Sequence, residues 1–276
     1  MRRLKVAALI SGEPGPLELW TLRGMAAVSC ELRVVRAARA TTEPAIRRAL
    51  RLVKRHGLLG TLSRYAGAEL GARVARQDRR LLEELMDHDE LLSWWARSGI
   101  ETADVPALND ARAQEVLEAM APHLIVRVSG GILKPAVFSL ARIATLNIHH
   151  GLAPLIRGMW SIPWGIVEGR RDWIGATIHV IDAGIDTGTV LWRGGPQLAP
   201  GDTSVDLLFR AHLEAVSALA SIIRMYADGE VPLPRPPDPG EVSVYRSAAG
   251  LAEWIKFLRL DRGRRARVLL ERGLEC

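Results

Sequence analysis

Short, almost wholly apolar runs bounded by glycine, proline or polar clusters recur along the first two-thirds of the chain. Three of them are residues 5–10, 123–129 and 143–148. Runs this short and this apolar are typical of strands buried on both faces of a parallel sheet. Stretches with helical spacing separate them, which favours an α/β architecture. We therefore predict an α/β fold with a Rossmann-like, mostly parallel sheet flanked by helices, and a small C-terminal appendage.

The rest of the sequence predicts the helices, the remaining strands and the division into domains. Residues 44–97 read as a helical insertion interrupted at Gly57, Gly60 and Gly71, with Pro44 in its first turn. A long helix is expected over 204–227, capped by Asp202-Thr203, and a proline-rich joint over 232–239. We expect one domain over 1–195 and a C-terminal helix with a small basic tail over 196–276. The other expected strands are 30–35, 100–105 and a hairpin of 176–181 with 189–192; the other expected helices are 111–120, 135–140 and 162–169.

Composition narrows the class of protein. No apolar run reaches the 18 or so residues that span a bilayer, and residues 11–15 cut the first run too short for a signal peptide. Two cysteines, Cys30 and Cys276, predict no disulfide framework and a cytoplasmic location. The net charge of +6 favours anionic partners.

An amide, an imidazole and a carboxylate follow one another at a strand end and a turn. Asn147 and His149 are two residues apart in an apolar run, so their side chains share one face of the strand. Asp186 lies in a glycine-flanked turn that brings a carboxylate to the imidazole. A donor amide, a base and a carboxylate that orients the base are the groups needed to transfer an acyl group to an amine.

The flanking residues carry a family resemblance. Asn147-Ile148-His149, with Pro154, Arg157-Gly158, Gly169 and Asp186-Thr187-Gly188, resembles the signature of the folate-dependent formyltransferase family. The resemblance covers about residues 110–195 well and the first hundred only weakly. It implies that Asn147, His149 and Asp186 are catalytic, that residues 1–195 form the catalytic domain, and that the one-carbon donor is 10-formyltetrahydrofolate.

The same resemblance implies two backbone segments that close around the pterin of the donor, and it implies no metal site. Glycines allow a flat ring to approach the backbone closely. Residue roles on the acceptor side stay open: His150 as acceptor contact or rim residue, Arg157 as loop support or anion contact, Trp160 in the acceptor pocket, and His179 as structural or substrate residue. The segments are Gly130, Gly131, Ile132 and Leu133, and Asp182, Ala183, Gly184 and Ile185.

Three departures from relatives bear on the acceptor. The 11–15 loop is not the glycine-rich phosphate loop of glycinamide ribonucleotide transformylase, and the tail after Pro239 is too short for the C-terminal barrel of methionyl-tRNA formyltransferase. We expect a small primary-amine acceptor, first a nucleotide-linked amino sugar, and no tRNA domain. Glycinamide ribonucleotide and a formyltetrahydrofolate hydrolase are the alternatives, and a homodimer is a further expectation.

The third departure is the basic helical stretch that begins with Arg47, Arg48, Arg51, Lys54 and Arg55. It reads either as an amphipathic cover with a solvated basic face or as a surface for the acceptor or another anion. It also motivates an alternative outside enzymology, a basic binding module for nucleic acid or a membrane surface on a degenerate core.

Overall fold

A seven-stranded sheet in the order β3-β2-β1-β4-β5-β7-β8 forms the centre of the computed structural model, which describes residues 4–28, 30–38, 45–199, 201–236, 238 and 240–271. β1 pairs in parallel with β2 and β4, β2 with β3, and β4 with β5, whereas β7 runs antiparallel to both β5 and β8. The predicted mostly parallel sheet with its terminal hairpin is confirmed. The strands are β1 (Leu4–Ser11), β2 (Cys30–Ala37), β3 (Thr102–Val105), β4 (Leu124–Arg127), β5 (Ala144–His149), β7 (Ala176–Val180) and β8 (Val190–Gly194).

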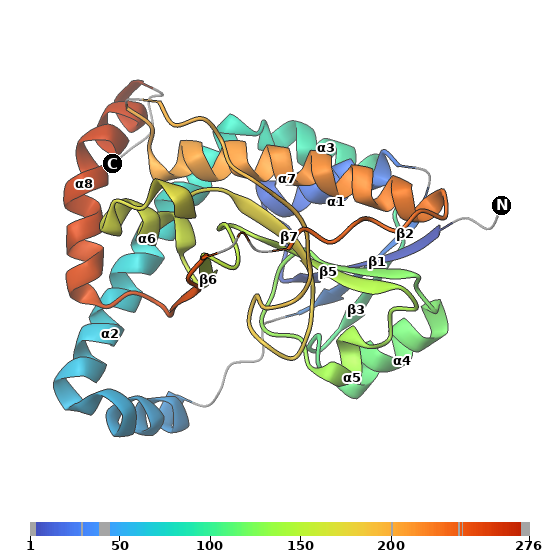
Figure 1. Ribbon diagram of the computed structural model, residues 1–276, viewed down its shortest axis with the longest axis horizontal. Helices are drawn as coiled ribbons and strands as arrows, with labels where there is room; N and C mark the ends of the chain where they lie inside the picture. The colour runs from blue at the N-terminus through green and yellow to red at the C-terminus, as the bar shows by residue number, and fades with distance from the viewer. Residues whose placement is uncertain are drawn as a thin grey trace.

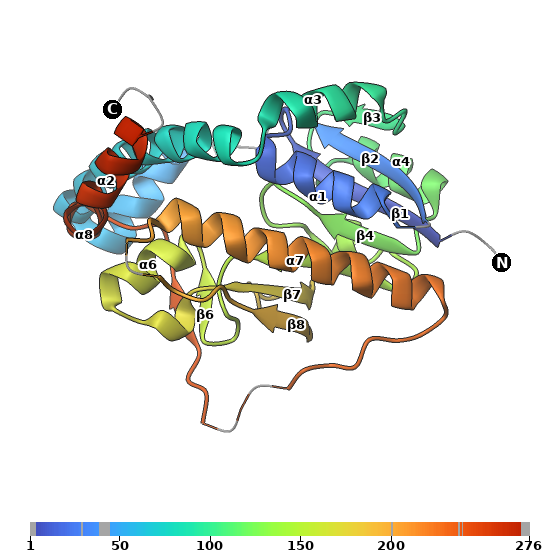
Figure 2. The same ribbon diagram turned by 90° about the horizontal axis from the view of Figure 1, so that it is seen from above.

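Helices cover both faces of this sheet (Figure 1; Figure 2). One face carries α1 (Pro16–Ala26) and α7 (Ser204–Ala227), with α3 (His88–Arg97) beside α1. Leu22 and Leu219 of these helices are fully buried against Val126 in the centre of the sheet. The other face carries α4 (Ala111–Met120) and α5 (Pro135–Phe138), whose Leu117 and Val137 pack on the central strands. The two apolar layers hold the carboxyl ends of β4 and β5 rigidly, and these ends carry the site.

One helix was missed, and two of the three predicted helix breaks, at Gly60 and Gly71, are wrong. Helix α1 was not expected, because Pro14 and Gly15 read as loop; Pro16 in its first turn was the missed signal. Helix α2 (Ala45–Leu85) is broken only at Gly57, where φ is 70°. At Gly71 a Cβ would lie 2.7 Å from the Trp254 ring, so this glycine allows close helix packing and does not end the helix. Pro44, Pro239 and Cys276 lie outside the described residues.

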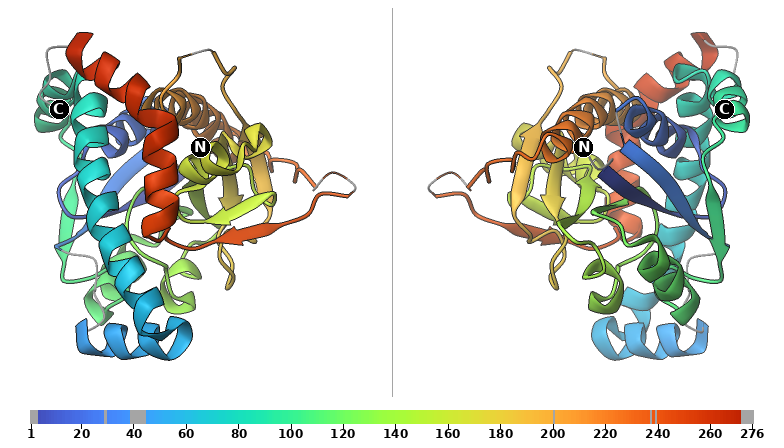
Figure 3. Two further views of the ribbon diagram at one scale, coloured as in Figure 1. Left: turned by 90° about the vertical axis from the view of Figure 1, so that its left-hand side faces the viewer. Right: turned by 90° about the vertical axis from the view of Figure 1, so that its right-hand side faces the viewer.

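The C-terminal part of the chain returns to the region of the site. Strand β6 (Ile156–Gly158) pairs in parallel with β9 (Val244–Arg246), a small sheet that the sequence did not indicate. Helix α8 (Leu251–Glu271) then packs against α2 and α6 (Ser161–Glu168) through buried Trp254 and Phe257 (Figure 3). A short 3₁₀ turn, η1, covers Arg171–Trp173. The predicted division after residue 195 stays a prediction, although α7 packs on the sheet itself.

No helix among the described residues combines the length and the apolar character that crossing a membrane requires.

Candidate active site

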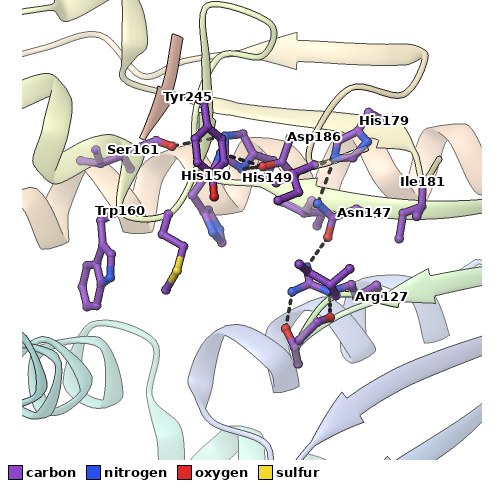
Figure 4. Close-up of a pocket in the computed structure, with 18 of the residues that line it drawn as sticks. Arg127, Asn147, His149, His150, Trp160, Ser161, His179, Ile181, Asp186 and Tyr245 are labelled. Atoms are coloured by element: carbon purple, nitrogen blue, oxygen red, sulfur yellow. Dashed lines mark hydrogen bonds and ion pairs between the residues drawn. The ribbon is translucent and has the colours of Figure 1, made fainter. Parts of the chain in front are cut away.

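A cavity of about 520 Å³ opens where β4 and β5 end, within the size range of small-molecule sites (Figure 4). The strand ends and the turn after β7 bring five polar side chains together at this cavity. The three residues predicted to be catalytic are among them, so the structure brings that set together. The five are Arg127 of β4, Asn147 and His149 of β5, His179 of β7 and Asp186 of the turn.

The amide of Asn147 has a fixed orientation. Arg127 donates from Nη1 to Asn147 Oδ1 over 2.6 Å, so the oxygen of the amide must face the guanidinium. The Nδ1 of His179 lies 2.9 Å from the Val180 carbonyl, which can only accept, so His179 Nε2 is left as an acceptor. Asn147 Nδ2 donates to that Nε2 over 3.0 Å. One N–H of the amide therefore remains to donate to an oxygen in the cavity.

Arg127 was not predicted as a site residue. Its guanidinium also donates to the carbonyls of Gly130 and Gly131, so one side chain holds both Asn147 and the glycine loop. Burial lowers the pKa of Arg127, and the charge of Asp186 opposes that shift. The missed signal was a lone arginine in an otherwise apolar central strand, because charged residues are rarely buried without a partner.

His149 faces the carboxylate of Asp186 with one nitrogen and the protein backbone with the other. Nε2 lies 3.2 Å from the Ile156 carbonyl and 3.3 Å from Ser161 Oγ, and since a carbonyl only accepts, Nε2 carries the hydrogen. Nδ1 then presents a lone pair 3.4 Å from Asp186 Oδ2. Burial lowers the pKa of His149, outweighing the carboxylate, which raises it. The neutral ring is thus ready to accept a proton at Nδ1, next to a group that stabilises the resulting cation.

Asp186 is held in place by three contacts. Gly158 donates its backbone N–H to Oδ2 over 2.9 Å, while Oδ1 and Oδ2 face His179 and His149 at 3.4 Å each. Its backbone is left-handed with φ 50°, a conformation that residues other than glycine adopt at a cost. Burial raises the pKa of this carboxyl, but the nearby rings of His179 and His149 and the hydrogen bond from the Gly158 N–H together bring it down to about 2. The carboxylate is therefore ionised at neutral pH.

Arg157, one of the predicted acceptor contacts, supports the turn. It does not line the cavity; its guanidinium donates to Ser243 Oγ over 2.7 Å and to the Ile185 carbonyl over 3.2 Å. Of the two roles left open by the sequence, the contacts match loop support, since Ile185 directly precedes Asp186.

His150 lines the cavity and begins a chain of hydrogen bonds that runs to His212 of α7 and from there to the backbone of α1. His212 Nε2 lies 3.0 Å from the Leu17 carbonyl, so it carries the hydrogen, and its Nδ1 accepts from His150 Nε2 over 3.0 Å. Burial, reinforced by the neighbouring His212 and His149, lowers the pKa of His150 well below its usual value. Burial also lowers the pKa of His212 to about 4, against the Leu17 carbonyl, which raises it. Both rings are neutral at neutral pH.

This pair predicts a pH-dependent stability. Between pH 6.5 and 4 the unfolded chain protonates at His212 and the folded chain does not, so the free energy of unfolding should fall as the pH falls. The shift of about 2.5 units corresponds to about 3 kcal/mol. Denaturant unfolding of the wild type and of His212→Gln across this window measures the effect. The variant should lose the part of the slope that His212 contributes while His150 and His149 keep theirs, and equal slopes in the two proteins would contradict the assignment.

The segments predicted to hold the folate do border the cavity. Seven of the eight residues line it, and Ala183 alone of that set does not. Gly130 has φ 117°, which favours glycine, and a Cβ on Gly131 would meet no atom within 4 Å, so the loop leaves room for a flat ring. Ile132 and Ile185 present apolar side chains that are 69% and 37% exposed. A glycine slot with apolar edges suits the pterin ring of a folate, and the Asn147 amide, which lines the same cavity, can donate to a formyl group carried on N10.

The other side of the cavity is aromatic and apolar. Trp160 lines it from the start of α6 and packs edge-on against Trp254, with ring centroids 5.0 Å apart. Met159 and Tyr245 also line this side, and Tyr245 comes from β9, a strand that was not predicted from the sequence. This wall is where the acceptor pocket was expected.

Curated proteins of known activity share part of this sequence. A methionyl-tRNA formyltransferase of Anaeromyxobacter dehalogenans (strain 2CP-C) is 32% identical over 183 residues, which cover 66% of this chain and 58% of that protein. The chain spans a little over half the length of such curated relatives.

Two solved structures share the fold over most of the chain. A 4-N formyltransferase from Francisella tularensis has a TM-score of 0.54 at 14% identity, covering 93% of this chain and 87% of its own. Glycinamide ribonucleotide transformylase 1 from Symbiobacterium toebii has a TM-score of 0.54 at 17% identity, covering 89% and 96%.

The family model described as Formyl transferase matches residues 71–223, which include α3, the strands that carry the site, and most of α7. Because that match covers more than half of the sequence, the chain belongs to the formyl transferase family.

Proposed function

We propose that this protein is an N-formyltransferase that moves the formyl group of 10-formyltetrahydrofolate to the primary amine of a small acceptor. The family takes its formyl group from this folate. The observation that carries the proposal is the fixed orientation of Asn147, which leaves an N–H free at the cavity beside the His149–Asp186 pair.

Each of the three residues has a role that follows from its geometry. The amine nitrogen attacks the formyl carbon, and the C–N bond to the folate breaks once N10 takes up a proton. Asn147 donates its free N–H to the formyl oxygen, where negative charge builds up in the transition state. His149 Nδ1 would accept the proton that the amine loses, Asp186 would stabilise the imidazolium, and His149 would then give this proton to the departing folate nitrogen N10. The formamide and tetrahydrofolate leave with the protons balanced.

For the donor, Gly130 to Leu133 and Asp182 to Ile185 would hold the pterin between them. Arg127 hydrogen-bonds both the glycine loop and the Asn147 amide, so a pterin bound at the loop would have its formyl group directed toward Asn147. Ile132 and Ile185 would shield the ring from water.

For the acceptor, we propose a small amine bound against Trp160, with His150 near the reacting nitrogen. The cavity volume of about 520 Å³ suits a small molecule, and the net charge of +6 suits an anionic one, so a nucleotide-linked amino sugar is our first proposal. Methionyl-tRNA is a second candidate, because curated relatives bearing that activity share about 32% identity with this chain.

The decisive experiment has two stages. Calorimetric titration with 5-formyltetrahydrofolate should show saturable micromolar binding, and absence of binding at millimolar ligand would refute the proposal. Consumption of 10-formyltetrahydrofolate is then followed with a nucleotide-linked amino sugar, glycinamide ribonucleotide, methionyl-tRNA or no acceptor. Turnover that is equal with and without acceptor, with release of formate, would identify a hydrolase.

A positioning role for Arg127 is testable in the same assay. In Arg127→Lys a single ammonium replaces a planar fork and cannot hold Asn147 and both glycine carbonyls together. We expect kcat to fall by about 10- to 100-fold, the value of a hydrogen bond to a charged group, and the KM for the folate to rise. Arg112→Lys on α4, an exposed arginine, is the control. An unchanged KM and kcat would show that the guanidinium does not position the amide.

A further inference from the structure

The first limb of α2 is an amphipathic helix whose apolar side is not covered. At about 100° per residue, Arg51 and Arg55 lie on the other side of the helix from Leu50 and Val53, whereas Lys54 lies beside Leu50. The two apolar side chains therefore form a narrow strip bordered by basic side chains. Leu50 is 66% exposed and Val53 39% exposed. An amphipathic helix in a globular protein normally buries its apolar side in the core.

The exposed apolar surface continues past the kink at Gly57. Leu58, Leu59, Leu62 and Tyr65 are 66%, 82%, 57% and 41% exposed. We call the surface of Leu50, Val53, Leu58, Leu59, Leu62 and Tyr65 the α2 apolar patch. Figure 1 shows this end of α2 projecting from the body of the molecule, and Figure 3 shows its first limb turned across the foot of the second.

The docked part of α2 begins at the last turn of the patch. Ser63 Oγ accepts the backbone N–H of Leu251, Arg64 donates to the Ala248 carbonyl, and Gly67 lies against the backbone at Gly250. The α8 connection thus anchors the helix from Ser63 onward and leaves the earlier turns projecting. The α2 apolar patch therefore projects from a helix whose later turns are held against the segment that leads into α8.

The charged side chains in this part of the sequence are all of one sign. Between Glu43 and Glu69 the sequence contains no Asp or Glu, and all its ionised side chains are cationic: Arg47, Arg48, Arg51, Lys54, Arg55 and Arg64. Long apolar side chains flanked by cations only are complementary to an apolar layer covered by anions. A bilayer with anionic headgroups has this structure.

Two other occupants fit less well. A second copy of the chain, related by a two-fold axis, would bring the same cations against each other. Single-stranded nucleic acid is held by aromatic platforms beside cations, whereas five of the six patch residues are aliphatic. We propose that the α2 apolar patch and its flanking cations form a peripheral docking site for an anionic lipid surface. Docking adds to the proposed formyl transfer and does not depend on it.

The test is flotation of the full chain with vesicles of phosphatidylcholine alone or containing about one-third phosphatidylglycerol, a typical anionic surface. We expect binding to the anionic vesicles and none to the neutral ones. Leu58→Asp/Leu59→Asp should reduce binding at least tenfold, and Lys54→Gln/Arg55→Gln about fivefold for each charge removed. Val231→Asp/Leu233→Asp, which changes two apolar residues that are 74% and 85% exposed after α7, is the matched control and should bind as the wild type does.

Three results would overturn the proposal. The first is no flotation with anionic vesicles at low salt. The second is binding to single-stranded RNA that survives Leu58→Asp/Leu59→Asp while vesicle binding is absent. The third is a dimer in sedimentation that this double variant dissociates. Unchanged melting temperatures of the variants show that loss of binding is not loss of fold, and a folate titration reports on the catalytic proposal separately.

Discussion

Asn147→Ala should lower kcat for formyl transfer by about 10²- to 10³-fold, the typical effect of removing one oxyanion donor. The free N–H of this amide is the donor that its neighbours leave for the formyl oxygen. Because that bond strengthens only as charge develops, the KM for the folate should change little. Single-turnover kinetics with 10-formyltetrahydrofolate and a saturating amine measure the chemical step directly.

The control must separate lost chemistry from lost structure. Asn147 is 4% exposed and bonds Arg127, so its removal leaves a buried cation with one acceptor fewer. The melting temperature and the affinity for 5-formyltetrahydrofolate of Asn147→Ala should therefore be measured beside those of Gln114→Ala, an amide on the distant α4. A folded variant that binds folate and turns over at the wild-type rate would remove Asn147 from the mechanism.

Asp186→Asn should lower kcat by a similar factor and change its pH dependence. The amide keeps an oxygen for the Gly158 N–H but carries no charge to stabilise protonated His149. Since the carboxylate raises the pKa of His149, its removal should shift the acidic limb of the kcat profile to lower pH. A pH profile of kcat for wild type and variant tests this.

Stability gives an independent readout of the same change. The Asp186 pKa of about 2 lies below the unfolded value near 3.9, so this group stabilises the fold above pH 4, and that contribution is lost as the pH falls toward 2. It amounts to about 2–3 kcal/mol. Asp172→Asn, at an exposed pair with Arg170, should retain both activity and the acid dependence. Wild-type behaviour of Asp186→Asn in both assays would exclude a stabilising role for its charge.

The sequence predicted what local patterning determines. Apolar runs located the strands, and the two-residue spacing put Asn147 and His149 on one face of β5, because side-chain alternation follows from the strand itself. The turn that carries Asp186 was also visible, since glycines flank it. The strands, the alternation of side chains and the turn are all determined by residues close to them in the sequence.

Contacts between distant segments were not predictable in this way. Arg127 and Asn147 lie in neighbouring parallel strands, and their hydrogen bond depends on the register of the pairing. The His150–His212 pair joins residues 62 positions apart through the packing of α7. Tyr245 reaches the cavity only because β9 joins β6, and a three-residue strand has no sequence signal of its own. Long-range packing decides all three.

The antiparallel pairing of β5 with β7, with Asn147 opposite His179, has a consequence for engineering. The backbone ladder fixes the relative positions of the proposed chemical groups, whereas Trp160 and Met159 belong to the excursion between those two strands. Residues 150–175 are therefore a module that could be exchanged with those of other family members while the ladder is left unchanged. The contacts of Ile156, Arg157, Gly158 and Ser161 with the proposed chemical groups and their supporting turn would have to be kept. Grafted chimaeras of this kind would allow the choice of amine to be evolved separately from the catalytic rate.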